Sequence, residues 1–94
     1  MTQEVTDTEL MARLKAGDEQ AFATLFQRHY RRVLNTAYRF IGSDAEADDI
    51  AQEAFLRVYR AAHRYEPRAL FTTWLYQIVT NLCLNWRRSK GRSR

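Results

Sequence analysis

The placement of glycine and proline constrains the fold of this chain more than any other feature. Three Gly and one Pro among 94 residues supply too few turn signals for a β-sheet. Gly17, Gly42 and Pro67 instead separate four segments in which apolar residues recur every three to four positions. That period is typical of amphipathic helices. The sequence therefore predicts an all-α fold, a compact four-helix bundle with short connections and a basic C-terminal tail.

Two capping boxes mark predicted helix starts. Thr6 stands three residues before Glu9, and Ser43 stands three residues before Glu46. In this motif the hydroxyl group accepts a hydrogen bond from a backbone N–H in the first turn of the helix. We therefore expect a first helix that runs from Thr6 to about Ala16 and a third helix that begins after Ser43.

The second and fourth predicted helices lie between these breaks. Asp18 is the predicted N-cap of the second helix, which we expect to end at Gly42. Pro67 interrupts the periodic pattern, so either Thr72 or Thr73 is the expected cap of the fourth helix. From about residue 89 the chain carries charge without an apolar stripe, and we expect a frayed, linker-like tail there.

The composition indicates one small folded domain with a basic end. Hydrophobic residues make up 46% of the chain and charged residues 28%, unlike a disordered sequence. The net charge is +4, and the last eight residues contain five basic residues and no acidic one. A cluster of this kind is typical of proteins that bind phosphate or another polyanion.

Neither catalysis nor a cofactor is expected. The chain has no glycine-rich phosphate loop, no HExxH and no CxxC. His29 and His63 fall on different predicted helices, whereas a tetrahedral metal site needs three or four converging ligands. Cys83 lies beside an apolar stripe and is expected to be a small core residue. Because the sequence shows neither a membrane-spanning run nor a signal peptide, we expect a cytoplasmic protein without a membrane partner.

The predicted third helix divides its polar residues between its two ends. The first part is acidic and the last part is basic: Asp44, Glu46, Asp48, Asp49 and Glu53, then Arg57, Arg60 and Arg64. Acidic residues stabilise a helix start through the helix dipole, so part of this pattern is structural. We favour capping, together with a negative docking face for a basic partner, over a cation site formed by Asp48, Asp49 and Glu53.

Amide side chains follow one face of the predicted fourth helix. Gln77, Asn81 and Asn85 are four residues apart, and Arg88 follows them on the same side. Because Asn is a weak helix former, its repeated use indicates a hydrogen-bonding role. Amides both donate and accept, which suits recognition of base edges. The alternative is that these are ordinary solvated polar residues.

Aromatic residues surround the connection before this helix. Single-strand binders combine stacking surfaces with cationic grooves, and Tyr65, Arg68 and Phe71 offer both. The alternative is that the two rings attach the connection to the core, which we favour for Phe71. Trp74 is expected to be half core and half stacking platform.

Two stretches resemble region 2 of bacterial extracytoplasmic-function (ECF) sigma factors. They are DIAQEAFLRVYR at residues 49–60 and FTTWLYQI at residues 71–78, followed by Asn81. The opening AGDEQAF at residues 16–22 is also similar, so the resemblance covers nearly the whole chain in order. It implies an N-terminal sigma domain that initiates transcription by binding the core of RNA polymerase and the promoter −10 element, and an anti-sigma factor as a further partner.

The resemblance also implies domain limits. Residues 1–88 correspond to the sigma domain, and residues 89–94 correspond to the start of a basic interdomain linker. The family's second domain, which binds the −35 element, is absent from this chain, so we expect the sequence to be part of a longer protein.

Two sets of site residues follow from the resemblance. The surface for the clamp coiled coil of the polymerase largest subunit corresponds to Asp48, Asp49, Gln52, Glu53, Leu56 and Arg57. The surface for −10 DNA corresponds to Tyr65, Glu66, Pro67, Arg68, Ala69, Leu70, Phe71, Trp74, Gln77, Asn81, Asn85 and Arg88. Within this second set, the loop 65–71 and Asn81 are implied to hold a flipped base of the non-template strand.

The sequence departs from the family pattern in two places. Many family loops contain a Phe-Arg-Gly type motif where this chain has YEPR at residues 65–68, which leaves the accepted base open. Primary sigma factors have two adjacent aromatic residues where this chain has Trp74 and Leu75. If Leu75 does not stack, strand separation is weakened by about 1–3 kcal/mol.

Two other functions compete with this interpretation. A helical adaptor that binds only proteins, without sequence-specific DNA binding, is the main alternative. A helix-turn-helix repressor is disfavoured because the connection at residues 65–71 is longer than the turn of that motif and lacks glycine.

Overall fold

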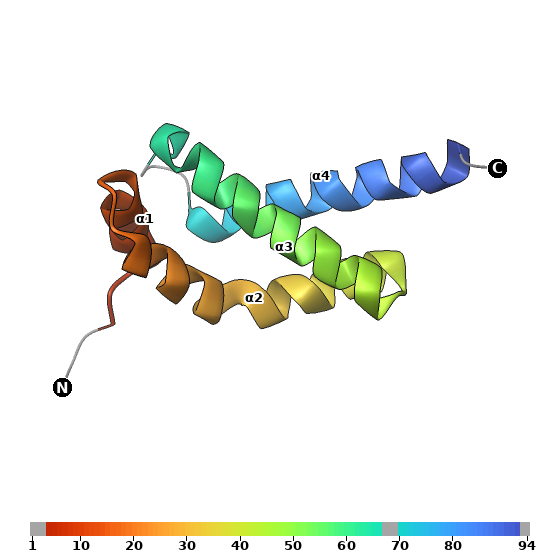
Figure 1. The fold of residues 1–94 in the computed structure, drawn as a ribbon, viewed down its shortest axis with the longest axis horizontal. Helices are drawn as coiled ribbons and strands as arrows, with labels where there is room; N and C mark the ends of the chain where they lie inside the picture. Colours follow the sequence, from red (N-terminus) through yellow and green to blue (C-terminus); the bar gives the residue numbers. More distant parts are fainter. Residues whose placement is uncertain (1–3, 67–69, 93–94) are drawn as a thin grey trace.

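The computed structural model describes residues 4–66 and 70–92, with side chains described as far as Lys90. Its elements are α1 (Asp7–Lys15), α2 (Glu19–Ile41), α3 (Asp44–Ala61), the short 3-10 helix η1 (Ala62–Arg64) and α4 (Phe71–Arg92) (Figure 1). No strand occurs in the described residues. The predicted all-α, four-helix architecture is confirmed.

Local sequence explains most of the helix ends. Thr6 and Asp18 each accept a hydrogen bond from a backbone N–H of the following helix, at 3.1 and 3.0 Å. Gly42 closes α2 with a φ of 77°, a left-handed conformation that glycine adopts without a Cβ clash. Ser43 does precede α3 as predicted, but its side chain makes no cap hydrogen bond.

Helix α4 begins earlier than the sequence indicates. Phe71 is its first residue, so Thr72 and Thr73 lie within the first turn and do not cap it. The backbone N–H of Trp74 already bonds to the carbonyl of Leu70 at 3.1 Å. Because Phe71 is buried, the need to pack this ring determines where the helix starts more strongly than hydroxyl capping does.

The same helix also ends later than predicted. Its backbone stays helical through Arg92, where the sequence indicates a frayed tail from about residue 89. Lys90 makes two contacts in these last turns: its Nζ lies 3.5 Å from a Glu46 carboxylate oxygen and 5.4 Å from the centre of the Trp86 ring. Each contact is exposed and weak: the Glu46 pair connects the end of α4 to the start of α3, and the Trp86 contact lies within α4.

The helices share one core, and helix α2 contacts α1, α3 and α4. The largest fully buried side chains come from all four helices: Met11, Leu25, Val33, Phe55, Val58, Leu75, Val79 and Cys83. The ring centre of Phe55 lies 5.0 Å from that of Phe26, within an aromatic cluster that joins α2 to α3. The prediction that Cys83 is a core residue is confirmed.

Two tyrosines remain exposed although their rings are large and apolar. Tyr38 on α2 and Tyr59 on α3 both present their rings to solvent. The Tyr59 hydroxyl donates to the Glu19 carboxylate at 2.6 Å, which holds the end of α3 against the start of α2. Among the described residues, no helix has both the length and the apolar character needed to cross a bilayer.

Candidate nucleic-acid and protein-binding surfaces

Helix α4 presents a polar ridge, which we define as Gln77, Asn81, Asn85 and Arg88. All four side chains are exposed, as the spacing predicts. Arg88 donates to the Asn85 side-chain oxygen at 3.0 Å. Gln77 and Asn81 make no side-chain hydrogen bond to any described residue. These two amides therefore keep their donors and acceptors available for a ligand.

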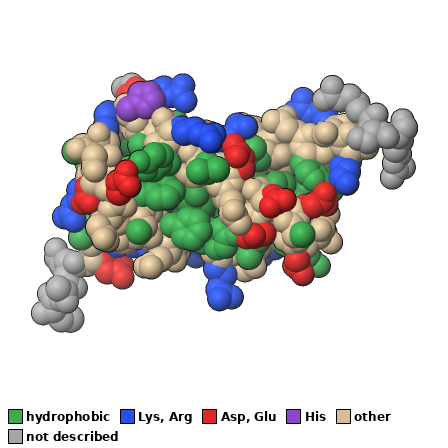
Figure 2. Space-filling view, in the orientation of Figure 1, with side chains coloured by type: hydrophobic (Ala, Val, Ile, Leu, Met, Phe, Trp, Pro, Cys, Tyr) green, Lys and Arg blue, Asp and Glu red, His purple; other side chains and the backbone are tan. Residues whose placement is uncertain are grey.

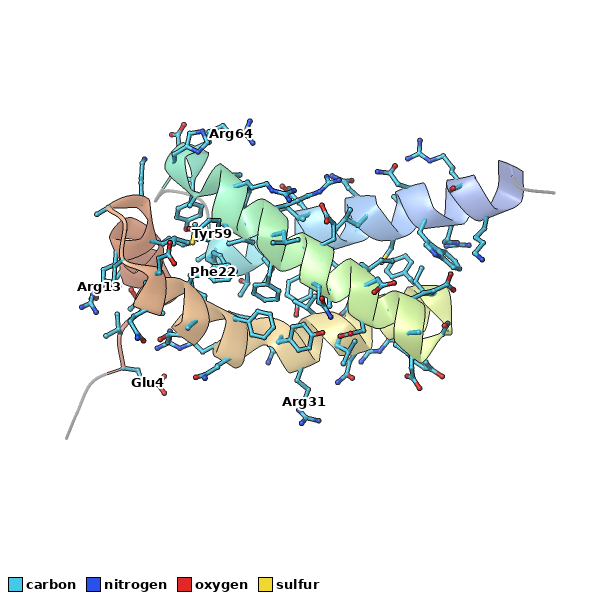
Figure 3. All side chains as sticks on the ribbon, viewed as in Figure 1. Glu4, Arg13, Phe22, Arg31, Tyr59 and Arg64 are labelled. Atoms are coloured by element: carbon cyan, nitrogen blue, oxygen red, sulfur yellow. The ribbon has the colours of Figure 1, made fainter. Side chains whose placement is uncertain are left out.

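Three grooves are lined in part by residues of α4, and one of them contains ridge residues. A ridge groove of about 550 Å³ is lined by Thr73, Tyr76, Gln77, Thr80 and Asn81. An arginine groove of about 650 Å³ between α2 and α4 is lined by Arg28, Arg31, Arg32, Asn35, Thr36, Arg39 and Tyr76. An α3 groove of about 300 Å³ is lined by Arg57, Arg60, Ala61, Arg64, Trp74 and Ile78. In Figure 3, Arg31 projects from α2 on the side away from α3, and Arg64 lies beyond the end of α3.

The aromatic residues of the predicted DNA loop belong largely to the core. Tyr65 and Phe71 are 5% and 2% exposed, and their ring centres lie 5.2 and 6.2 Å from that of Trp74. The interpretation of Phe71 as a core residue is confirmed. For Tyr65, which the sequence left open between stacking surface and core, the structure shows a core position because the ring is almost fully buried. Trp74 is half-buried, as predicted.

The other loop positions differ in accessibility. Glu66 and Leu70 are both exposed. The positions of Pro67, Arg68 and Ala69 lie outside the described residues, and so do their predicted DNA contacts. The described part of the loop therefore presents Glu66, Leu70 and one side of Trp74 near the ridge.

The residues predicted to meet RNA polymerase lie together on one side of α3. We define this outer face by Asp48, Asp49, Gln52, Glu53, Leu56 and Arg57. Acidic side chains gather at the right of Figure 2, over the start of α3. Leu56 is 46% exposed in the middle of this face. The arrangement is a charged surface with one apolar contact point.

Most side chains of the outer face are bonded to one another or to α2. Asp48 accepts hydrogen bonds from the Tyr30 hydroxyl and, at 2.8 Å, from the Gln52 amide. Glu53 lies 3.4 Å from Arg57 and 3.7 Å from Arg60. Asp49 has no such partner among the described residues. These contacts therefore fix the conformation of the outer face without a partner.

Three side chains have a raised pKa. The hydrogen bond from Tyr59 to Glu19, reinforced by the Glu19 charge, raises the pKa of the Tyr59 hydroxyl. Burial raises the pKa of the Tyr76 hydroxyl, against opposite influences of Arg32 and Thr36. Burial also raises the pKa of the Cys83 thiol. All three groups are therefore neutral near pH 7 and suited to packing or hydrogen bonding.

No metal centre is found in the described part of the chain, where no three His, Cys, Asp or Glu side chains converge. His29 is instead bonded to Asp7, whose carboxylate lies 3.0 Å from its Nε2. The ring of His29 lies 5.4 Å from that of Phe71. Its role is to connect α1 and α2 to the first turn of α4.

The sequence interpretation missed the arginine side of α2. It assigned this helix only an apolar stripe, although α2 carries four arginines against a single acidic residue, Glu19. Arg28, Arg32 and Arg39 are separated by four and seven residues and therefore lie on one side of the helix. That spacing is the sequence signal from which the basic side of α2 could have been predicted.

Comparison with known proteins gives a consistent family. A model of Sigma-70 region 2 matches residues 25–93. The chain is 38% identical over 92 residues to the RNA polymerase sigma-H factor of Pseudomonas aeruginosa, covering 98% of this chain and 47% of that protein. It is 35% identical over 92 residues to the ECF RNA polymerase sigma-E factor of Escherichia coli, covering 98% of this chain and 48% of that protein. The chain thus spans about half the length of the curated relatives it matches.

Solved structures agree with this result. An engineered region 2 of sigmaE, determined in complex with GTAAAA, superposes with a TM-score of 0.89 at 34% identity, covering 99% of this chain and 97% of that one. CnrH, determined in complex with the cytosolic domain of CnrY, gives a TM-score of 0.74 at 30% identity, covering 84% and 51%. The resemblance noted at residues 49–60 and 71–78 is confirmed. The chain belongs to the Sigma-70 region 2 family, and its relatives are sigma factors of the ECF type.

Proposed function

We propose that this chain is a transcription-initiation domain that binds RNA polymerase core and stabilises the opened promoter −10 element. The observation that carries the proposal is the α4 ridge, where Gln77 and Asn81 keep unbonded amides beside the ridge groove. The related engineered region 2 of sigmaE was determined in complex with GTAAAA, which supports the same class of ligand. The domain acts in the cytoplasm by binding, not as an enzyme, and needs no cofactor.

In this proposal one base of the non-template strand leaves the stack and enters a pocket formed by the loop 65–71 and Asn81. Flipping a base out of the stack costs a few kcal/mol, which pocket contacts and stacking offset. The Asn81 amide supplies a donor and an acceptor for the base edge. The half-buried Trp74 provides the adjacent apolar surface, and Asn85 and Arg88 contact neighbouring bases and phosphates.

The outer face of α3 is the proposed surface for polymerase. Its partner is the clamp coiled coil of the largest subunit, with Leu56 as the apolar contact inside a charged rim. Residues 1–88 form the binding domain, and residues 89–94 begin a basic linker whose first part continues α4. An anti-sigma factor is a further proposed partner, because the relative CnrH was determined in complex with the cytosolic domain of CnrY.

Asn81→Ala tests DNA recognition. We expect it to weaken binding of a fluorescent GTAAAA strand by about 1–3 kcal/mol and to relax discrimination at one base. Competition with strands that carry each single-base substitution measures both effects. Gln27→Ala, which removes an exposed amide from α2 outside the three grooves, is the control and should leave binding unchanged.

The competing functions predict different results in the same assay. An adaptor that binds only proteins would show no discrimination among strands. A duplex-binding repressor would prefer double-stranded DNA. Equal affinity of the unmodified chain for duplex, scrambled strand and GTAAAA would refute the proposal.

Asp49→Asn tests polymerase docking separately. Asp49 has no partner among the described residues, so its carboxylate is free to meet a basic partner. We expect the affinity for core polymerase to fall by about 2 kcal/mol or more, with an unchanged unfolding midpoint. Asp44→Asn removes the same charge from the first turn of α3 outside the outer face, and should leave polymerase binding intact. Equal losses in both variants would indicate a general charge effect.

A further inference from the structure

The arginine groove between α2 and α4 is not among the surfaces assigned so far. Its cations come from a single helix, and Arg28, Arg31, Arg32 and Arg39 all line it. The only acidic residue of α2, Glu19, stands nine positions before Arg28 and is bonded to Tyr59. The groove therefore carries a concentrated positive charge, which attracts anions.

Most of this charge is not neutralised within the protein. Arg31, Arg32 and Arg39 form no ion pair with any described residue. Arg28 is paired, with its guanidinium nitrogen 3.1 Å from the Asp7 carboxylate. Three guanidinium groups on one wall of the groove thus remain free to bind a ligand.

The α3 groove, on the other side of α4, has less unbalanced positive charge than the arginine groove. It also contains three arginines, but Arg57 and Arg60 both lie within 4 Å of the Glu53 carboxylate, at 3.4 and 3.7 Å. Part of the positive charge there is already balanced. The arginine groove therefore has three arginines without an ion pair among the described residues, whereas the α3 groove has one, Arg64.

Tyr76 connects the arginine groove to the site of base recognition. It lines both the arginine groove and the ridge groove, so the two grooves adjoin at this residue. The Tyr76 hydroxyl is buried without a hydrogen-bond partner in the described residues. Thr36 lies close enough to influence its pKa, but no hydrogen bond of normal geometry joins the two side chains.

We propose that the arginine groove binds the sugar–phosphate backbone of the same DNA strand whose bases meet the α4 ridge. The proposal rests on the function proposed above. Guanidinium groups bind phosphate oxygens through paired, charge-assisted hydrogen bonds. Arg28 and Arg39 are eleven residues apart, about 16 Å along the helix axis, which is long enough for several successive phosphates. The ridge selects the base, and the arginine groove holds the strand.

A pair of matched triple variants tests the proposal. Arg31→Gln/Arg32→Gln/Arg39→Gln removes the free cations of the arginine groove, and Arg57→Gln/Arg60→Gln/Arg64→Gln removes those of the α3 groove. Both change the net charge from +4 to +1. Fluorescence anisotropy with a short oligo-dT, repeated across a series of NaCl concentrations, measures affinity and its salt dependence. Thermal unfolding checks that both variants remain folded.

We expect the two glutamine variants to differ in the slope of log affinity against log salt concentration. Because each phosphate contact on a single strand contributes about 0.7 to the slope, the arginine-groove variant should lose about two units and the α3-groove variant less than about 0.7. Arg31→Lys/Arg32→Lys/Arg39→Lys keeps the charges and should keep the slope. Equal changes in the two glutamine variants, or no binding of oligo-dT by the unmodified chain, would overturn the arginine-groove proposal.

This test can fail independently of the proposed function. Oligo-dT contains no sequence information, so the slope reports backbone contacts alone. A chain that discriminates normally among GTAAAA variants but shows equal slopes in both triple variants would keep its proposed function without the arginine groove. A slope difference without any base discrimination would support the groove and refute base recognition.

Discussion

The outer face of α3 and the ridge of α4 are both polar, but their side chains differ in whether they are bonded within the protein. On α3, Asp48 and Glu53 are already bonded to neighbouring side chains. On α4, Gln77 and Asn81 are bonded to no described residue. One surface is thus coupled to the stability of the fold, whereas the central part of the other is not.

The difference matches the kind of partner that each surface is proposed to bind. A face that its own contacts hold in place loses little conformational entropy when a rigid protein surface docks on it. A ridge with free amides can exchange water for base edges without breaking any internal hydrogen bond. Substitutions of Asp48 or Glu53 on α3 should therefore affect both stability and binding, while substitutions of Gln77 or Asn81 on α4 should affect binding alone.

Tyr30→Phe should give the largest effect on stability. It removes the hydroxyl that donates to Asp48 and leaves that carboxylate with only the Gln52 amide. Since hydrogen bonds to charged groups contribute about 1.5–3 kcal/mol, we expect the free energy of unfolding to fall by about that amount. Urea unfolding measures it. Tyr38→Phe is the matched control on the same helix, because Tyr38 is exposed and has no partner among the described residues.

Equal free energies of unfolding for the two tyrosine variants would show that the bond from α2 to Asp48 does not support the outer face. A loss of stability in Tyr30→Phe alone would show that the bond supports the outer face, and polymerase binding by this variant would then measure how much the rigidity of the face matters for docking.

Glu53→Gln should give a smaller loss. Its ion pairs with Arg57 and Arg60 are largely exposed, so we expect the free energy of unfolding to fall by about 0.3–1 kcal/mol at low salt. The loss should shrink as salt is added, because ions screen exposed pairs. Parallel unfolding of Asp49→Asn, whose carboxylate has no described partner, gives the baseline. A loss that does not respond to salt would point to packing instead of charge.

Gln77→Ala should have the smallest effect on stability. Gln77 is exposed and makes no internal bond, and alanine is the better helix former, so unfolding should change by less than about 0.5 kcal/mol and in the stabilising direction. Binding of the GTAAAA strand should nevertheless weaken. A clear destabilisation of this variant would show that the ridge is part of the fold after all.

Features set by local sequence were predictable. Asp18 and Gly42 define the limits of α2 through capping and backbone conformation, which depend on a few neighbouring residues. Periodicity likewise placed Gln77 and Asn81 on an exposed side of α4, since a helix fixes the direction of each side chain.

Features that depend on contacts between distant segments were not predictable. The helical end of α4 is supported by Lys90, whose partner Glu46 lies 44 positions earlier. Tyr65 is buried because Trp74 and Phe71 pack against it after the chain has turned. The arginine groove needed the knowledge that Tyr76 of α4 lies beside α2. None of these contacts leaves a periodic signal in the sequence.

The rate at which a reagent modifies Cys83 reports how often α4 separates from the other helices. Cys83 is the only thiol in the chain, it is fully buried, and it lies on α4 beneath the ridge. A thiol reagent can therefore reach it only when α4 separates from the other helices, and burial keeps the reactive thiolate scarce until then. A ligand that binds only the closed form would slow the labelling by a factor of one plus the ratio of its free concentration to its Kd. The labelling rate of a single unmodified residue thus reports the occupancy of the strand site without any added fluorophore.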